Sequence, residues 1–339
     1  MSKVSGLVRA AAGVGVAGVA GLAYANAETR RFVVRDFTVP VLPPGEKDVR
    51  VLCVSDFHLV PSQQRKLEWI SSLRDLKPDL VVNTGDNLAH ADAVDPLLEA
   101  LGPLLTETPG VFVNGSNDYW APVPKNPARY LLPDSRGGVT TPDTELPWRT
   151  MVETFTESGW KNLNNRRDSV TLRDGRALSF VGVDDAHSDL DVFPRRDDAT
   201  ADGPTTNGGA GAGTGGATTD GGNGAGDGIL HVGVTHAPYL RVLSEFQEDG
   251  AALVLVGHTH GGQLRIPGFG ALVTNCDLDR RRASGLNGWP GARPDSRLGT
   301  DSLWLHVSAG AGTSPYAPFR FACRPEASLL TLVPADTTT

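Results

Sequence analysis

The chain has 339 residues and a net charge of −8. A chain of this length can bury a sizeable hydrophobic core, and its acidic balance argues against nucleic acid as a partner. It contains three cysteines; none has C-x-x-C spacing, which argues against both a disulfide framework and a thiolate zinc site.

The N-terminal segment is weakly apolar. Residues 10–27 are uncharged and consist mostly of Ala, Gly and Val, a run barely long enough to cross a bilayer. Because Ala25-Asn26-Ala27 resembles a signal-peptidase site, residues 1–31 are either an uncleaved membrane anchor, which we favour, or a cleaved signal of a secreted protein. Basic residues flank the run at both ends, and their distribution weakly favours an outer-face location for the rest of the chain.

Strand-like and helix-like segments alternate after this segment. Nearly continuous apolar runs predict strands buried on both faces, and amphipathic stretches predict helices between them. The predicted strands are 49–56, 79–86, 110–118, 177–185, 229–238, 251–260, 302–310 and 328–334. The predicted helices are 62–76, 92–105 and 149–159. This order predicts one α/β domain over residues 49–334 that becomes richer in strands towards its end.

Residues 200–228 differ from the rest of this domain. They are Gly, Thr and Ala with almost no large apolar side chain, so they cannot bury enough surface to offset the entropy of ordering. We expect a flexible insert rather than a domain boundary, because polar motifs lie on both sides of it.

Polar side chains follow several of the predicted strands at equivalent places. The segments at these strand ends are Asp56-Phe57-His58, Gly85-Asp86-Asn87, Gly115-Ser116-Asn117-Asp118, Thr235-His236 and Gly257-His258-Thr259-His260. Each one alone could be a helix cap or a packed side chain. Together they are stronger evidence, because the carboxyl ends of parallel strands meet at one edge of a sheet, where ligands bind.

The residue types at these ends indicate metal binding. Mixed carboxylate and imidazole ligands suit Mn, Fe or Zn better than Mg or Ca. Two carboxylates and four imidazoles are more than one ion needs, so we expect two divalent ions that share a carboxylate. Such a pair can hold the attacking and leaving oxygens of an in-line displacement at phosphorus.

The order of the motifs, D-F-H, G-D, G-S-N-D, H and G-H-T-H, resembles that of the calcineurin-like metallophosphoesterase family. The extended GHTHGGQLRIP and the N-terminal apolar segment resemble the bacterial, membrane-associated branch of that family. The resemblance implies a four-layer α/β/β/α sandwich of two mixed sheets. It also implies hydrolysis of phosphomonoesters, phosphodiesters or pyrophosphates by a metal-bound hydroxide.

By position, the resemblance also implies a ligand set. Asp56, His58 and His260 would bind the first ion, and Asp86 would bridge to the second. His236 and His258 would bind the second ion together with an asparagine. The implied substrate is a phosphorylated small molecule or a lipid-linked phosphate, which the anchor would hold near a bilayer.

One motif departs from the family pattern. Aligned without a gap, the ligand asparagine falls on Ser116 and the neighbouring catalytic histidine falls on Asn117. We expect Asn117 to be the ligand, because its amide oxygen is a hard donor, and we take Asp86, Asn117 and Asp118 as the candidate catalytic residues. Asparagine donates a hydrogen bond but no proton near neutral pH, so esters with poor leaving groups should react slowly.

This departure keeps two alternatives open. The chain could be a metal-binding sensor or scaffold that has lost useful catalysis. Alternatively, His187 could replace the missing histidine if its loop covers the site, although a surface loop is the default expectation for it. The basic run 279–285 is expected to be a solvated loop, or else a contact with phosphate or with an anionic membrane.

Overall fold

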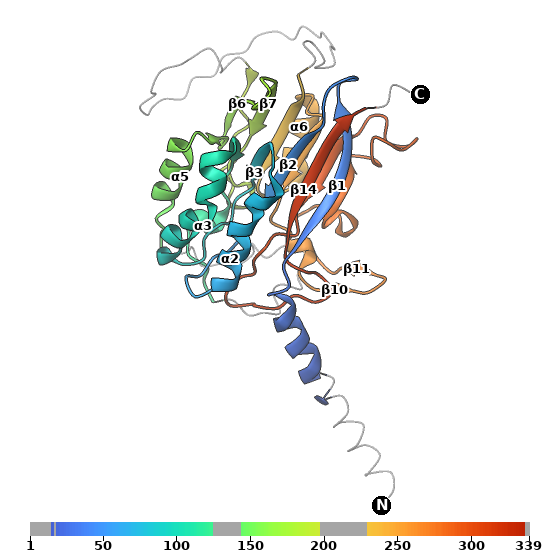
Figure 1. The fold of residues 1–339 in the computed structure, drawn as a ribbon. Coiled ribbons are helices and arrows are strands. Elements are labelled where there is room, and N and C mark those ends of the chain that lie inside the picture. The colour runs from blue at the N-terminus through green and yellow to red at the C-terminus, as the bar shows by residue number, and fades with distance from the viewer. Residues whose placement is uncertain (1–14, 17, 125–143, 197–228, 336–339) are drawn as a thin grey trace, which may run out of the picture.

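Two six-stranded sheets form the centre of the molecule (Figure 1). The computed structural model describes residues 15–16, 18–124, 144–196 and 229–335. In order across the first sheet, the strands are β1 (Val33–Leu42), β14 (Glu326–Pro334), β2 (Val49–Val54), β3 (Leu80–Asn83), β4 (Gly110–Phe112) and β5 (Lys161–Asn162). In the second sheet they are β12 (Gly285–Trp289), β13 (Leu303–Val307), β9 (Leu253–Val256), β8 (His231–Thr235), β7 (Ala177–Gly182) and β6 (Arg166–Thr171).

Both sheets are mixed. Strands β2 to β5 are parallel to one another, while β14 runs antiparallel to β2 and parallel to β1. In the second sheet β7, β8, β9 and β13 are parallel, and β6 and β12 run antiparallel at the two edges. The parallel strands at the centre of each sheet therefore end at a common edge, as the sequence pattern predicts.

Helices cover the outer face of each sheet. On the first sheet these are α2 (Gln64–Ser72), α3 (Val94–Glu107) and α5 (Trp148–Glu157), and on the second it is α6 (Leu240–Glu248). Strand β2 shows why its sequence is continuously apolar: Leu52 and Val54 pack under the helices, while Val51 and Cys53 pack between the sheets. Phe246 of α6 closes a third apolar layer on the second sheet. The predicted four-layer α/β/β/α sandwich is confirmed.

Seven of the eight predicted strands are longer than the observed ones, and only β14, the strand predicted at 328–334, extends further than predicted. Each apolar run forms the strand, whereas the polar residues after it form a loop that leaves the sheet. Several elements were not anticipated, among them β1, β5, β6 and β12, the helix α6, and the hairpin of β10 (Arg265–Ile266) and β11 (Gly270–Ala271). The Gly-rich insert at 200–228 lies outside the described residues.

The N-terminal helix and the β10–β11 hairpin lie at the same end of the molecule (Figure 1). Residues 15–16 and 18–28 of this helix are described. Its last turns contact the domain, because Arg320 donates its backbone N–H to Ala25 and Cys323 donates to the Glu28 carboxylate. Among the residues that the structure describes, no helix is long and apolar enough to cross a membrane.

Candidate metal centre

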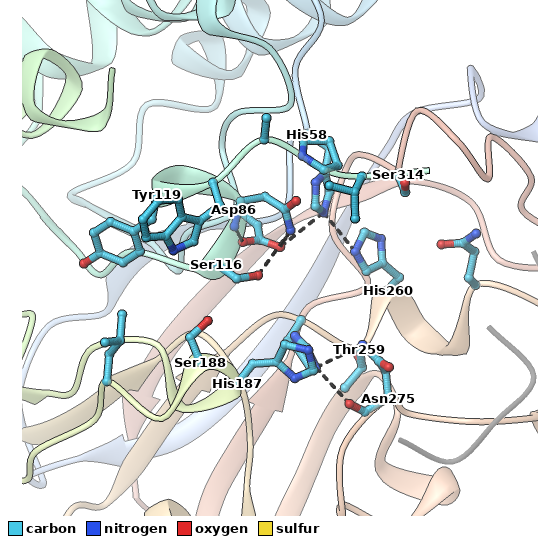
Figure 2. A pocket seen from close by; sticks show the side chains of 18 of the residues that line it. His58, Asp86, Ser116, Tyr119, His187, Ser188, Thr259, His260, Asn275 and Ser314 are labelled. Carbon is cyan, nitrogen blue, oxygen red and sulfur yellow. Dashed lines mark hydrogen bonds and ion pairs between the residues drawn. The ribbon is translucent and has the colours of Figure 1, made fainter. Parts of the chain in front are cut away.

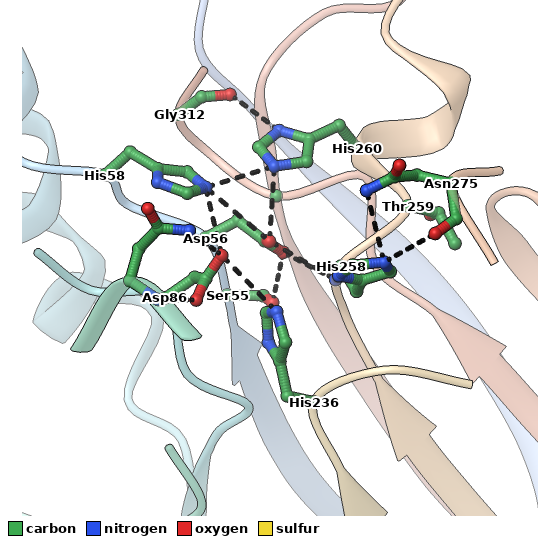
Figure 3. Close-up of polar contacts among 12 residues, drawn as sticks. Ser55, Asp56, His58, Asp86, His236, His258, Thr259, His260, Asn275 and Gly312 are labelled. Atoms are coloured by element: carbon green, nitrogen blue, oxygen red, sulfur yellow. Dashed lines mark hydrogen bonds and ion pairs between the residues drawn. The ribbon is translucent and has the colours of Figure 1, made fainter. Parts of the chain in front are cut away.

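The seven candidate ligands all lie in segments that directly follow central strands of the two sheets. Asp56 and His58 follow β2, Asp86 follows β3, and Asn117 lies in the short helix α4 (Ser116–Tyr119) after β4. From the second sheet, His236 follows β8, and His258 and His260 follow β9. Loops from both sheets thus supply the residues of one site (Figure 3).

Five of these side chains form two overlapping groups. In the first, Asp56, His58 and His260 have ligand atoms that all lie within 4.8 Å of one another. In the second, the same is true of Asp56, Asp86 and His236. Asp86 Oδ2 lies 3.3 Å from His58 Nε2 and 3.4 Å from His236 Nε2, so this carboxylate stands between the two groups.

Backbone carbonyls orient two of the imidazoles. His236 Nδ1 lies 2.8 Å from the Thr84 carbonyl and His260 Nδ1 lies 3.1 Å from the Gly312 carbonyl, so each ring donates its Nδ1–H there. The Nε2 lone pairs are then directed towards the carboxylates. A hydrogen bond from Nδ1–H to a carbonyl imposes this tautomer on metal-binding histidines.

Two further observations test whether cations fit here. His236 Nε2 is buried and has no hydrogen-bond partner among the described residues, which is a costly state for a polar atom unless a ligand occupies it. The Nε2 atoms of His58 and His260 lie 3.1 Å apart. Two nitrogens bound to one tetrahedral ion at the usual Zn–N length lie about 3.3 Å apart. The donor set fits divalent ions of the zinc or manganese type.

Burial and neighbouring charges set the protonation states. Burial lowers the pKa of His58 to about 4, and it lowers the pKa values of His258 and His260 well below the usual value. Burial would also lower the pKa of His236, but the Asp86 carboxylate raises that pKa well above the usual value. Burial would raise the pKa of Asp86, yet His236 and His58 hold it well below the usual value. His58, His258 and His260 are therefore neutral imidazoles beside an ionised Asp86 carboxylate, whereas Asp86 favours the protonated form of His236.

The backbone of the site is strained. Five of the seven candidate ligands have positive φ, between 40° and 68°: Asp56, His58, Asp86, His258 and His260. This region of φ is unfavourable for residues with a side chain and costs about 1–3 kcal/mol each. Such strain is typical of functional sites, and the sequence pattern gave no sign of it.

Glycines allow the loops to approach one another. A Cβ on Gly115 would overlap Asp86 Oδ1 and would lie 2.8 Å from His236 Cγ. A Cβ on Gly257 would overlap Ser55 Oγ and lie 2.7 Å from Asp56 Oδ2. The glycines that precede Ser116 and His258 are therefore required by space rather than by backbone conformation, since neither has positive φ.

The GSND segment places its three polar side chains differently. Asn117 donates its backbone N–H to Asp86 Oδ1 at 2.8 Å, and its side-chain amide lies 3.0 Å from Asp86 Oδ2. Ser116 Oγ lies 3.3 Å from the same amide. Asp118 is fully buried and accepts backbone N–H groups from Asp86, Asn87 and Gly115. Asp118 thus holds the Asp86 loop from behind instead of facing the cavity.

His258 lies at the edge of the cluster. Its backbone N–H donates to Asp56, but its Nε2 lies 3.1 Å from the Asn275 carbonyl, away from the two groups of ligand atoms. The loop that carries His187 does fold over the site. The rings of His187 and His258 are 4.5 Å apart, and His187 Nδ1 lies 2.9 Å from the hydroxyl of Tyr239. The expectation of a surface position for His187 was wrong.

A cavity of about 1010 Å³ opens over the cluster (Figure 2). His58, Asp86, Asn117, His258 and His260 line its floor and His187 lines one wall. Aromatic side chains contribute to the lining as well: Tyr119, Trp120 and Trp148. The cavity can hold a substrate considerably larger than a phosphate ion.

The sequence profile of the calcineurin-like phosphoesterases matches residues 49–262. A transmembrane protein with a metallophosphoesterase domain from Danio rerio is 26% identical over 240 residues, which is 68% of this chain and 44% of that protein. Phosphodiesterase YaeI of Escherichia coli is 37% identical over 81 residues, 24% of this chain and 25% of that protein. The chain thus spans less than half the length of either relative.

A third relative is similar over more of its length. The uncharacterized metallophosphoesterase YkuE of Bacillus subtilis is 23% identical over 302 residues, which is 86% of this chain and 82% of that protein. Among solved structures, TT1561 of Thermus thermophilus aligns with a TM-score of 0.36 and 12% identity, over 78% of this chain and 91% of that one.

Proposed function

Because the chain belongs to the calcineurin-like phosphoesterase family, we propose that it is a metal-dependent phosphoester hydrolase that works with two divalent ions. Asp56, His58 and His260 would hold the first ion, and Asp86 would be shared with the second. His236, His258 and Asn117 would complete the second site. His258, which lies at the edge of the cluster, would have to turn its ring from the Asn275 carbonyl towards the ions.

One observation carries this proposal. The Nε2 atom of His236 is buried, faces Asp86 Oδ2 at 3.4 Å and has no hydrogen-bond partner among the described residues. A ring that is held by the Thr84 carbonyl on one side and unsatisfied on the other is prepared for a cation. The Asp86 carboxylate next to it supplies the charge.

The residues of the cavity suggest how a phosphoester is held. Two divalent ions, when bound, would lower the pKa of a water molecule and polarise the phosphoryl oxygens. Asn117 lies against Asp86 with an amide that can donate to a phosphoryl oxygen after a small shift. His187 stands on the opposite wall, where it can donate a hydrogen bond to the leaving oxygen.

The substrate class follows from the cavity and from the relatives. We propose a phosphodiester of a small molecule or of a lipid, since one relative is named a phosphodiesterase. The chain would be held at a membrane by its N-terminal segment, with the catalytic domain on the outer face. Contacts of Ala25 and Glu28 with the domain support an anchor that is retained instead of cleaved after Ala27.

The test uses the full chain in detergent, stripped with a chelator and reloaded with manganese. We would measure bound metal per chain and turnover of p-nitrophenyl phosphate, bis(p-nitrophenyl) phosphate and a UDP-sugar lipid. Asp86→Ala should abolish turnover and reduce the bound metal, whereas Asp92→Ala should change neither, because the Asp92 side chain is 83% exposed in the same loop. Turnover that persists in Asp86→Ala would refute the proposed centre.

A sensor or scaffold is the second candidate. It is favoured by Asn117, which lies where the family pattern has a catalytic histidine. Two bound ions per chain without turnover of any of the three substrates would support this alternative.

A further inference from the structure

Large apolar side chains are exposed at the end of the molecule that carries the N-terminal helix. In the β10–β11 hairpin, Ile266 is 49% exposed and Phe269 is 60% exposed. In the helix, Val19 and Leu22 are 69% and 60% exposed. We call these residues, with the rest of the hairpin and helix, the hairpin–helix surface. Scattered apolar residues are ordinary on a protein surface, but a contiguous group marks an interaction site.

The hairpin and the helix form one continuous surface. Between them lies an apolar groove of about 490 Å³. Leu22 and Ala25 of the helix line one side, and Leu264 and Ile266 line the other. Phe321 also lines the groove and is in edge contact with Tyr24, at 5.2 Å between ring centroids. The apolar lining of the groove suits a hydrocarbon chain better than water.

Positive charge lies next to this groove although the chain as a whole is acidic. The turn Arg280–Arg282 contacts β11, and the Arg280 guanidinium lies 4.8 Å from the centre of the Phe269 ring. Asp279 is paired with Arg282 at 2.6 Å. Within the described part of the chain, neither Arg280 nor Arg281 has an acidic partner, and both are exposed.

One acidic group lies nearby. Asp277 is exposed, and its carboxylate accepts the backbone N–H of Leu240, at the start of α6. Asp279 and Arg282 neutralise each other. The charges that remain on this part of the surface are those of Arg280 and Arg281 against that of Asp277. Apolar side chains beside unpaired arginines are the pattern of proteins that lie on anionic lipid.

We propose that the hairpin–helix surface binds an anionic lipid bilayer directly. Ile266 and Phe269 enter the boundary between headgroups and acyl chains, and Arg280 and Arg281 bind lipid phosphates. The hairpin and the two arginines add a lipid contact to that of the N-terminal anchor, and this contact needs no turnover, so it goes beyond the proposed function. Leu264 lines both the groove and the cavity over the metal centre. The active-site cavity therefore opens beside the lipid headgroups.

The test places an environment-sensitive fluorophore on the hairpin of the full chain. The cysteines Cys53, Cys276 and Cys323 are buried, so a Phe269→Cys variant can be labelled selectively with NBD. Vesicles of phosphatidylcholine and phosphatidylglycerol should shift the emission to the blue, and nitroxide-labelled lipid should quench it. The same label at Arg173→Cys, in the exposed β6–β7 turn at the opposite end of the molecule, should show neither effect.

Lipid charge and arginine charge are then varied. Pure phosphatidylcholine vesicles, or the Arg280→Gln/Arg281→Gln pair in the labelled chain, should weaken the blue shift at least about threefold at equal lipid. Turnover of a soluble phosphodiester should be unchanged, because none of these residues lines the metal centre.

Three outcomes would overturn the proposal. In the first, the chain sediments with the vesicles but the label on residue 269 stays in water, so that only the N-terminal segment anchors it. In the second, the chain does not bind vesicles at all. In the third, the label shifts without lipid and the chain elutes as a dimer that Ile266→Asp dissociates, which would assign this surface to a second copy of the chain.

Discussion

A single buried arginine organises the loop that orients His260. Arg320 is fully buried, and its guanidinium donates to the carbonyls of Ala309, Gly310 and Gly312 at 2.7–3.0 Å. Gly312 is also the carbonyl that receives Nδ1–H of His260. Arg320 thus acts through a backbone carbonyl on the tautomer and direction of a candidate metal ligand, which makes it a positioning residue.

We expect Arg320→Lys to weaken metal binding by about 10–100-fold, the usual cost of losing an outer-shell partner. A lysine keeps the charge but cannot reach three carbonyls at once. Metal affinity would be measured by chelator competition well below the melting temperature. Arg324→Lys is the matched control, since Arg324 donates to the carbonyls of Arg31 and Phe32, outside the site. Equal affinities in the two variants would contradict the positioning role.

Lys66 gives the protein a pH dependence of its own. It lies on α2, is 5% exposed, and its Nζ donates to the Phe57 carbonyl at 2.6 Å. Burial, with a contribution from the Arg320 charge, lowers its pKa from 10.5 to about 7. Between these two values the unfolded chain binds more protons than the folded one. The free energy of unfolding therefore rises with pH between about 7 and 10.5. The stability that the neutral amine contributes is complete above this window and is lost as the pH falls through about 7.

In Lys66→Met we expect this slope to disappear. The wild type should gain up to about 1.4 kcal/mol per pH unit relative to the variant between about pH 7 and pH 9. Urea unfolding of the metal-free chain at several pH values would measure the difference. Lys47→Met, at an exposed lysine, should give a curve parallel to that of the wild type. A parallel curve for Lys66→Met as well would show that Lys66 does not titrate in this range.

The wall position of His187 leads to a prediction about leaving groups. If its imidazole donates to the leaving oxygen, His187→Asn should lower kcat for an alkyl phosphodiester on the order of 100-fold and leave kcat for a nitrophenyl ester within about threefold. The measurement is kcat against the pKa of the leaving alcohol. His90→Asn, at an exposed histidine, is the control. Equal losses for both esters would mean that His187 only packs against His258.

At the scale of elements, the junction between β4 and α4 requires a residue without a side chain. Gly115 brings the α4 turn against Asp86 and His236. In Gly115→Ala the added methyl group must displace the Asp86 carboxylate. We therefore expect metal binding and turnover to fall by about 100-fold, and stability to fall by about 1–3 kcal/mol. Gly21→Ala, where a Cβ would meet open space, should leave all three unchanged.

The outcome for Gly115→Ala would be read from bound metal, turnover and thermal unfolding of the same preparation. A variant that unfolds earlier but binds metal as tightly as the wild type would show that the loop relaxes away from Asp86. In that case the close approach would be a matter of packing rather than of ligand geometry.

The sequence predicted those strands and helices whose own residues show a clear pattern. It did not predict those that depend on pairing with a distant segment. Strands such as β2 and β9 are buried on both faces, and their continuous apolar runs identify them without any partner. Strand β1 contains Arg35, Asp36 and Pro40 and pairs with β14 nearly three hundred residues later, so no local pattern reveals it. Strands β6 and β12 are edge strands with one exposed side, and their mixed sequences read as loops.

The candidate site was predictable in its residue types and their order, but not in its geometry. That Asp56, His58, Asp86, His236 and His260 would lie together follows from the convergence of parallel strand ends. The positive φ values of five ligands, the outward ring of His258 and the inward ring of His187 do not. They result from contacts between distant loops, such as those of Asn275 and Tyr239, which no local pattern encodes.

For the whole molecule, the metal centre, the hairpin and the N-terminal helix lie at one end. The last turns of the helix are hydrogen-bonded to the loop of Arg320 and Cys323, and Arg320 orients the loop of His260. A bilayer at this end would place the cavity mouth at the height of the headgroups. Substrates that are embedded in the same bilayer would then meet the site at a high effective concentration.

This arrangement predicts a preference for lipid-borne substrates. A diacyl phosphodiester with a p-nitrophenol leaving group, in anionic vesicles, should be hydrolysed with a kcat/KM at least about tenfold above that of soluble bis(p-nitrophenyl) phosphate. Ile266→Asp should remove this advantage and leave the soluble reaction unchanged, because Ile266 lies in the hairpin and not in the metal centre. If the variant lost both activities equally, the hairpin would be supporting the fold of the site. If the wild type showed no advantage in vesicles, contact with the membrane would not raise the effective concentration of substrate at the active site.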